Sequence, residues 1–215
     1  MEWALLEPLE HAERAELESR LRRRRFRRGQ VVFNEGEVGD ALYLIESGRF
    51  DVQAATPQGH VVVLRVLHPG EFFGELALVH PDLARTGRIS ALEAAETLAL
   101  SRRDFDELRD RHPRLDRMLV AALADRLKRT SDLVVELLMP AEVRLWRRLC
   151  VLDEAYGPGN TIAMSQDDLA RIAGSVRQTV NRLLKRAEAD GVLAIERGAV
   201  RVLDRRALEQ MSGEG

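Results

Sequence analysis

The sequence lacks most of the residues that build redox centres and covalent cross-links. Its single cysteine, Cys150, excludes an intrachain disulfide, a four-cysteine iron–sulfur cluster and a cysteine-rich zinc site. Because the flanking residues Leu149 and Val151 are apolar, we expect Cys150 to be a buried structural thiol. His11 and His80 are single candidates for a haem ligand, and we interpret both as surface residues.

Long apolar runs are also missing. No segment approaches the length of a membrane span, and the N-terminus carries early acids in place of the basic-then-apolar pattern of a signal peptide. We therefore expect a cytoplasmic protein without a membrane partner. No cluster of residues forms a recognisable nucleophile or metal motif, so we expect neither an enzyme nor a bound metal.

Neither sign of charge dominates the chain. Lysine and arginine total 33 against 35 acids, for a net charge of −2, so nucleic-acid binding would need a local basic surface. The run Arg22–Arg28 is strongly basic. One interpretation is a nucleic-acid patch; the favoured one is a solvated strand whose arginines pair with nearby acids.

The stretch from Gln30 to Ser101 predicts a β domain. Glycines and the pair Pro69-Gly70 separate short extended segments at near-regular spacing, as in a closed or sandwiched antiparallel domain. An amphipathic helix over Glu2–Leu21 is expected to precede it. The segments expected as strands are Val31–Phe33, Ala41–Ile45, Phe50–Ala54, Val61–Leu67 and Leu92–Leu100.

The segment after Arg102 is helical in pattern. A short helix over Asp104–Arg111 should stop before Pro113, and Leu115–Leu138 then runs without glycine or proline. Six residues of this long helix, all but one of them apolar, recur at alternating spacings of three and four, which predicts a parallel coiled-coil homodimer. The alternative is one helix lying on its own domain. The residues of this predicted seam are Val120, Leu123, Leu127, Thr130, Val134 and Leu137.

Beyond Met139-Pro140, which should end the long helix, the sequence predicts a helix over Ala141–Ala155 and then a helix-turn-helix. Ser165 is the expected N-cap of its first helix, and Gly174 supplies the turn. The next helix presents a basic and amide-rich face suited to base edges and phosphates. A hairpin should follow as a wing. The residues expected to contact DNA are Ser165, Arg177, Gln178, Thr179, Asn181, Arg182, Lys185 and Arg197.

Upstream, Gly74-Glu75-Leu76 and Arg85-Thr86 indicate a pocket for a small phosphate ester. A glycine lets backbone approach a ligand, a carboxylate accepts from sugar hydroxyls, and an arginine neutralises phosphate. Their order ahead of a helix-turn-helix indicates a ligand-controlled DNA-binding protein.

From about Leu5 to Asp204 the chain resembles the cyclic-AMP receptor/FNR family of bacterial transcription regulators. The resemblance rests on Gly36-Glu37 through Gly48, on Pro69–Leu78 and on the helix-turn-helix. It implies an α+β protein with an N-terminal jelly-roll cyclic-nucleotide-binding domain (1–112), a dimerisation helix and hinge (113–139) and a C-terminal winged helix-turn-helix (140–215).

The resemblance also implies residue roles. Glu75 would meet the ribose, Arg85 and Thr86 the cyclic phosphate, with backbone near Gly74, Leu76 and Thr86 assisting. Thr130-Ser131 stands where cyclic-AMP receptors contact adenine from the dimerisation helices, so cyclic AMP is the first choice of ligand and cyclic GMP the second. Double-stranded palindromic DNA and RNA polymerase are the implied macromolecular partners.

Three positions depart from the family pattern. Gly87 replaces the usual alanine after the phosphate-binding pair, Arg65 replaces a smaller polar residue near the base, and Gln178 replaces the usual glutamate. Because glutamine prefers adenine, a different operator is expected. Two alternatives stay open: a regulator that is active without nucleotide or senses another ligand, and a cyclic-nucleotide-binding regulatory subunit of an enzyme.

Overall fold

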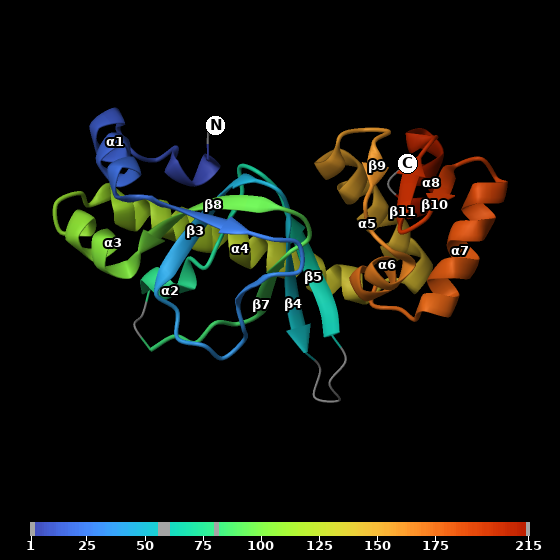
Figure 1. The fold of residues 1–215 in the computed structure, drawn as a ribbon, viewed down its shortest axis with the longest axis horizontal. Helices are drawn as coiled ribbons and strands as arrows, with labels where there is room; N and C mark the ends of the chain where they lie inside the picture. Colours follow the sequence, from blue (N-terminus) through green and yellow to red (C-terminus); the bar gives the residue numbers. More distant parts are fainter. Residues whose placement is uncertain (1–2, 56–60, 80–81, 214–215) are drawn as a thin grey trace. The chain divides into compact units, whose positions relative to one another are not determined.

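The structure is a computed structural model, and it describes residues 3–55, 61–79 and 82–213 (Figure 1). The chain forms two compact units, one of Met1–Ala54 with Arg65–Ser131 and the other of Ala55–Leu64 with Asp132–Gly215. The domain boundaries predicted at residues 112 and 139 were drawn from the expected role of each segment, and they remain a prediction. His80 lies outside the described residues.

Two four-stranded sheets have the strand orders β1-β8-β3-β6 and β2-β7-β4-β5, and all of their strands except the end of β4 and most of β5 belong to the first unit. Antiparallel pairing joins β8 to β1 and β3, β3 to β6, and β7 to β2 and β4. This strand order is that of a jelly roll, as predicted. The strands are β1 Arg22–Phe26, β2 Val31–Phe33, β3 Ala41–Ser47, β4 Phe50–Ala55, β5 Val61–Leu67, β6 Phe72–Phe73, β7 Arg88–Ala91 and β8 Ala95–Ser101.

An aromatic core fills the space between the sheets. Phe50 is fully buried, and its ring lies 5.6 Å from that of Phe26 and 5.2 Å from that of Phe73. Tyr43 stacks on Phe73 with ring centroids 5.0 Å apart. Because alternate residues of a strand face the same side, the predicted period-two pattern puts these rings inside.

The strand predicted over Leu92–Leu100 was partly wrong. Residues 88–91 form β7 in one sheet and 95–101 form β8 in the other, and β7 was missed. The chain changes sheets between them, where the amide of Leu92 donates to the carbonyl of Arg49 at 2.8 Å. The sequence does not indicate the bend at which this segment leaves one sheet and enters the other.

The arginine run forms strand β1, as the favoured interpretation predicted. Arg23 pairs with Glu46 at 2.6 Å and also with Glu96, and Arg25 pairs with Glu96 at 2.8 Å. Glu96 lies directly opposite Arg25 on β8. Cross-strand pairs of opposite charge stabilise such an edge.

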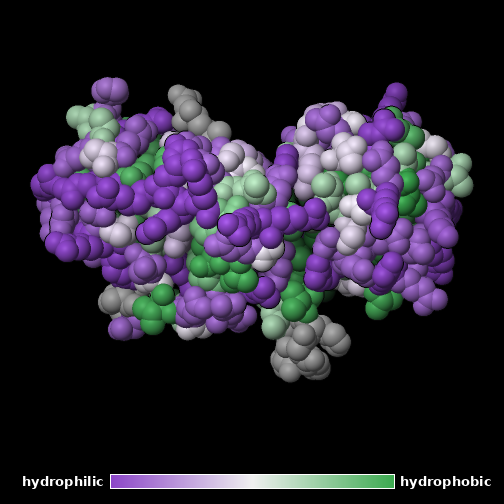
Figure 2. All heavy atoms as spheres, in the orientation of Figure 1, coloured by the Kyte–Doolittle hydropathy of each residue, from purple (hydrophilic) through white to green (hydrophobic). Residues whose placement is uncertain are grey.

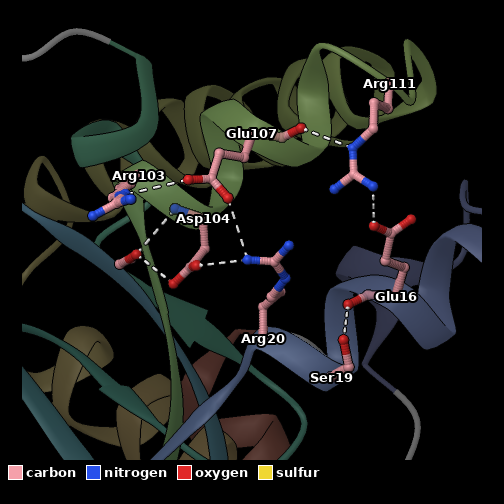
Figure 3. A network of polar contacts seen from close by, with 8 residues as sticks. Glu16, Ser19, Arg20, Arg103, Asp104, Glu107 and Arg111 are labelled. Atoms are coloured by element: carbon pink, nitrogen blue, oxygen red, sulfur yellow. Dashed lines mark hydrogen bonds and ion pairs between the residues drawn. The ribbon is translucent and has the colours of Figure 1, made fainter.

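The single helix predicted at the N-terminus was wrong in extent. A 3-10 helix η1 (Ala4–Leu6) and helix α1 (His11–Arg20) replace it, because Pro8 lacks the amide that a continuous helix needs. Arg20 joins α1 to helix α3 (Arg102–Arg109) through Asp104 and Glu107 at 3.3 and 3.2 Å (Figure 3).

Helix α4 (Arg114–Leu137) confirms the long helix predicted from the sequence. Its first half packs against the jelly roll through Leu115, Met118 and Ala122, within a cluster that includes residues of η1, α1 and α3. Most residues of its second half are exposed in the single chain. A further short helix, α2, covers Leu76–Val79.

The second unit holds helix α5 (Ala141–Tyr156), helices α6 (Gln166–Ile172), α7 (Arg177–Ala189) and α8 (Arg205–Ser212), and a sheet of order β10-β11-β9. The strands are β9 Thr161–Ile162, β10 Leu193–Glu196 and β11 Ala199–Val202. Its core includes Trp146, Leu169 and Leu184. Cys150 is buried there, as predicted.

Hydrophilic side chains cover most of the face of the molecule shown in Figure 2. No helix in the described part of the chain is long and apolar enough to cross a membrane.

Candidate ligand pocket and nucleic-acid interface

Gly74 brings the predicted phosphate loop against the jelly roll. Its φ of +85° favours glycine, and a Cβ there would lie 2.8 Å from both the Ala41 carbonyl oxygen and Nη1 of Arg85. Gly39 lies on another side of the same guanidinium, where a Cβ would lie 3.1 Å from Cζ of Arg85. The two glycines therefore leave room for the buried arginine.

Arg85 is turned toward the protein's own backbone. Its Nη1 donates to the Gly74 carbonyl at 3.1 Å and its Nη2 to the Ala41 carbonyl at 3.0 Å. Its guanidinium carbon lies 4.0 Å from the centre of the Phe33 ring, and Asp40 is 3.6 Å from Nη2. Burial lowers the pKa of Arg85, against the opposing fields of Tyr43 and nearby acids. Its buried Nε has no hydrogen-bond partner among the described residues.

Glu75 and Thr86, predicted to meet the ribose and the phosphate, are joined by one side chain. Arg126 of helix α4 donates to Oε1 of Glu75 at 2.8 Å and to Oγ1 of Thr86 at 3.2 Å. The Glu75 side chain is 3% exposed, so this ion pair compensates a nearly buried carboxylate.

Arg126 was missed from the sequence. The available signal was its position four residues before Thr130, which puts both on one face of the helix.

A pocket of about 320 Å³ opens beside Glu75, within the first unit. Of the residues predicted to bind the ligand, Glu75 lines it; Arg126 and the departure Arg65 line it too. Arg65 pairs with Glu71 at 2.5 Å, and burial lowers the pKa of Arg65 against the field of Glu71. The wall combines these charges with apolar side chains that include Leu5, Phe72 and Met118.

Thr130 and Ser131 do not line this pocket. Both are exposed in the single chain, and their hydroxyls donate to the backbone of α4, to the carbonyls of Arg126 (2.9 Å) and Leu127 (3.1 Å). Four of the five apolar seam residues are exposed as well: Val120 by 65%, Leu127 by 69%, Val134 by 56% and Leu137 by 50%. The fifth, Leu123, is partly buried against the core of the first unit.

The helix-turn-helix forms as predicted in the second unit. Ser165 caps α6, accepting from the Asp168 amide at 3.2 Å, while Asp168 accepts from the Ser165 amide at 2.9 Å. This reciprocal arrangement is a capping box. Gly174 has a φ of +56° at the turn, and α7 begins three residues later.

Helix α7 buries Val180, Leu183 and Leu184 and leaves a polar face outward. Arg177 pairs with Asp167 of α6 at 3.1 Å, with both side chains more than half exposed. Of the other residues predicted to contact DNA, Gln178, Arg182 and Lys185 are exposed, and Ser165, Thr179 and Asn181 are partly buried. Arg197 is exposed at the β10–β11 turn. These side chains can donate hydrogen bonds to the acceptor groups of DNA bases and phosphates.

Among the described residues no group of three or more histidine, cysteine or acidic side chains could hold a metal ion.

Two family models match the chain. Residues 23–112 match a "Cyclic nucleotide-binding domain" and residues 143–211 match a "Crp-like helix-turn-helix domain".

Known proteins of similar sequence and structure are regulators. The "Cyclic AMP receptor protein" of Thermus thermophilus is 34% identical, across 90% of this chain and 89% of that protein. The "CRP-like cAMP-activated global transcriptional regulator" of Mycobacterium tuberculosis is 33% identical, across 83% of each chain. The crystal structure of the Thermus thermophilus catabolite activator protein is 33% identical, with a TM-score of 0.56 over 98% of this chain and 99% of that one.

Proposed function

The chain belongs to the cyclic-AMP receptor/FNR family of transcription regulators, which are not enzymes, and we propose that a cyclic nucleotide controls its binding to DNA as a homodimer. Cyclic AMP is the first choice of nucleotide. The observation that carries the proposal is the Glu75–Arg126–Thr86 bridge, in which the predicted phosphate loop meets the long helix.

The proposed site divides the nucleotide among three elements. Glu75 accepts from the ribose, Arg85 and Thr86 hold the cyclic phosphate, and amides near Leu76 assist. Thr130 contacts the base. Ser131 of a second copy completes the site, because the exposed apolar seam supports pairing of two α4 helices.

Binding has to rearrange the arginines. The ribose competes with Arg126 for Glu75, and the phosphate competes with the backbone carbonyls that now hold Arg85. Each exchange replaces a bond within the protein by a bond to the ligand. The ligand therefore shifts an equilibrium between two arrangements by its differential affinity, with a coupling of roughly 1–3 kcal/mol sufficient for a useful switch.

The readout is proposed to be the orientation of two α7 helices. In the bound dimer, α4 is extended or rigidified near Leu137–Pro140, and the helices enter successive major grooves of a palindrome about 34 Å apart. RNA polymerase is the expected partner on the promoter, and the cytoplasm the expected compartment.

Calorimetric titration with cyclic AMP and cyclic GMP tests this proposal, alone and with operator DNA selected from random sequence. Binding of cyclic AMP that strengthens operator binding supports it. If neither nucleotide binds, the proposal is wrong.

A second candidate is a regulator that is active without nucleotide. The observation in its favour is that both terminal nitrogens of Arg85 and of Arg126 already donate hydrogen bonds to groups of the protein. Full operator affinity of the nucleotide-free protein would select this candidate.

A further inference from the structure

Arg144, in the first turn of helix α5, binds backbone at two separate helix ends. Its Nη1 donates to the carbonyls of Leu137 (3.4 Å) and Met139 (2.6 Å), where α4 ends. Its Nε donates to the carbonyl of Ala173 at 2.9 Å and its Nη2 to that of Gly174 at 3.0 Å, where α6 gives way to the turn. All of these residues belong to the second unit.

Both carbonyl pairs need donors from elsewhere. The last carbonyls of a helix have no partner within it, and Pro140, which follows Met139, brings no amide hydrogen. Gly174 leaves the helical path with a φ of +56°. Arg144 therefore supplies hydrogen bonds that local backbone does not.

The shape of the Arg144 side chain couples the two helix ends. A guanidinium is planar and carries five N–H donors in a fixed fork, and four of them are engaged here. Displacing one carbonyl pair therefore moves or releases the other. Because α7 begins three residues after Gly174, the turn held by Arg144 sets where that helix starts.

Two neighbouring arginines of α5 make different contacts. Arg147 donates to the Ser212 carbonyl at 3.2 Å, in α8, and Arg148 pairs with Glu136 of α4 at 2.8 Å. All three arginine residues are partly buried. Arg148 thus joins α5 to α4, and Arg147 joins α5 to α8.

We propose that Arg144 is the positioning residue that couples the end of helix α4 to the turn of the helix-turn-helix. The part of this proposal that concerns the response to nucleotide rests on the proposed function, nucleotide control of DNA binding. A change in α4 that withdraws the carbonyls of Leu137 and Met139 would loosen Ala173 and Gly174 through the same side chain.

The first measurement is the ratio of operator affinities with and without saturating cyclic AMP, for the full-length wild type, Arg144→Ala, Arg144→Lys and the matched control Arg147→Ala. The wild type and Arg147→Ala should show the same ratio of affinities, within the roughly 5- to 150-fold range of allosteric coupling. The ratio for both Arg144 variants should fall to within about twofold of one, since one ammonium cannot reach both carbonyl pairs. Cyclic-AMP affinity without DNA should stay within about threefold of wild type.

The second measurement needs no nucleotide. Hydrogen exchange of peptides covering 135–139 and 170–176 should accelerate together in Arg144→Ala, by about tenfold, and in neither peptide of Arg147→Ala. Arg148→Ala should accelerate exchange in the first peptide only. Circular dichroism checks folding, and the lysine variant carries the comparison if the alanine variant does not fold.

Several outcomes would overturn the proposal. These are a wild-type ratio in Arg144→Ala, an equal loss of operator affinity with and without nucleotide, full recovery by lysine, or faster exchange in one peptide alone. If the wild type itself does not respond to nucleotide, the proposed function fails, and the exchange measurement still decides the role of Arg144.

Discussion

Arg126 and Glu75 form an ion pair at 2.8 Å that joins the long helix to the predicted phosphate loop. The Glu75 side chain is almost completely buried, whereas that of Arg126 is 42% exposed. The carboxylate therefore depends on an arginine that solvent also reaches, and a ligand that replaces this arginine would act on both elements at once.

Replacing this arginine should destabilise the fold. We expect Arg126→Gln to lower the free energy of unfolding by about 1 kcal/mol, at the low end for a buried partner because solvent screens Arg126. Urea denaturation measures it. The control is Arg103→Gln on α3, whose ion pair with Glu107 joins side chains that are 88% and 44% exposed, so its loss should cost no more than about 0.5 kcal/mol. Equal effects of the two substitutions would contradict the prediction.

The parts of the fold that the sequence predicts well are those with local signals. Glycine and proline mark the strand ends, the uninterrupted segment after Pro113 marks α4, and Ser165 with Gly174 marks the helix-turn-helix. Arg126 and Arg144 were not identified, because each has a defining partner far away in sequence: Arg126 meets Glu75 across 51 residues, and Arg144 meets Ala173 across 29. A single sequence does not show which of its 33 basic residues meets a given carbonyl or acid.

The buried position of Arg85 changes what its substitution should do. Arg85→Leu would remove the arginine's hydrogen bonds to the carbonyls of Ala41 and Gly74, of which Gly74 keeps the bond from the Ala77 amide at 3.1 Å. We therefore expect both lost nucleotide binding and a fold weakened by about 1–3 kcal/mol. Calorimetry and urea denaturation separate the two effects. Arg85→Lys retains the charge and should bind nucleotide more weakly than wild type but more tightly than the leucine variant. Unchanged cyclic-AMP affinity in a folded leucine variant would remove Arg85 from the site.

The exposed seam predicts how the protein associates. Leu127 is 69% exposed in the single chain, so Leu127→Asp should leave the fold of the chain intact while placing a charge inside the proposed dimer. Analytical ultracentrifugation should show a dimer for the wild type and a monomer for the variant at micromolar concentration. Lys128→Asp puts the same side chain one position away, off the seam, and should remain dimeric. A dimer that survives Leu127→Asp would assign association to another surface.

The capping box of α6 predicts a dependence on pH. Burial raises the pKa of Asp168, but hydrogen bonds from the side chain and amide of Ser165 and from Arg171 outweigh it and hold that pKa below its ordinary 3.8. A lowered pKa contributes stability above 3.8 that disappears as the pH falls through the folded-state value.

Asp168→Asn should therefore cost about 1 kcal/mol at neutral pH, and this difference from wild type should vanish in strong acid. Denaturation curves across the pH range measure it. Asp167→Asn, in the same helical turn but outside the capping box, should show no comparable convergence. A constant difference for Asp168→Asn would show that its charge does not stabilise the cap.

The recognition helix and the wing predict two kinds of DNA contact. Arg177 stands at the start of α7, where a side chain reaches base edges, so Arg177→Ala should cost about 1–3 kcal/mol on the selected operator and relax specificity at one base of each half-site. Arg197, at the tip of the wing, should contact phosphate instead. Arg197→Ala should weaken binding on all sequences alike and reduce the salt slope by about 1.

Titrations against the operator, single-base variants of it and unrelated DNA, each at several salt concentrations, distinguish these contacts. The free protein offers a further check, because Arg177 must leave Asp167 to reach a base. Asp167→Asn removes that competition and should strengthen binding without changing which base is preferred, since the amide neither attracts Arg177 nor repels phosphate. If Arg177→Ala weakens every sequence equally, Arg177 is a phosphate contact, and the specificity of the helix must come from Gln178 and its other side chains.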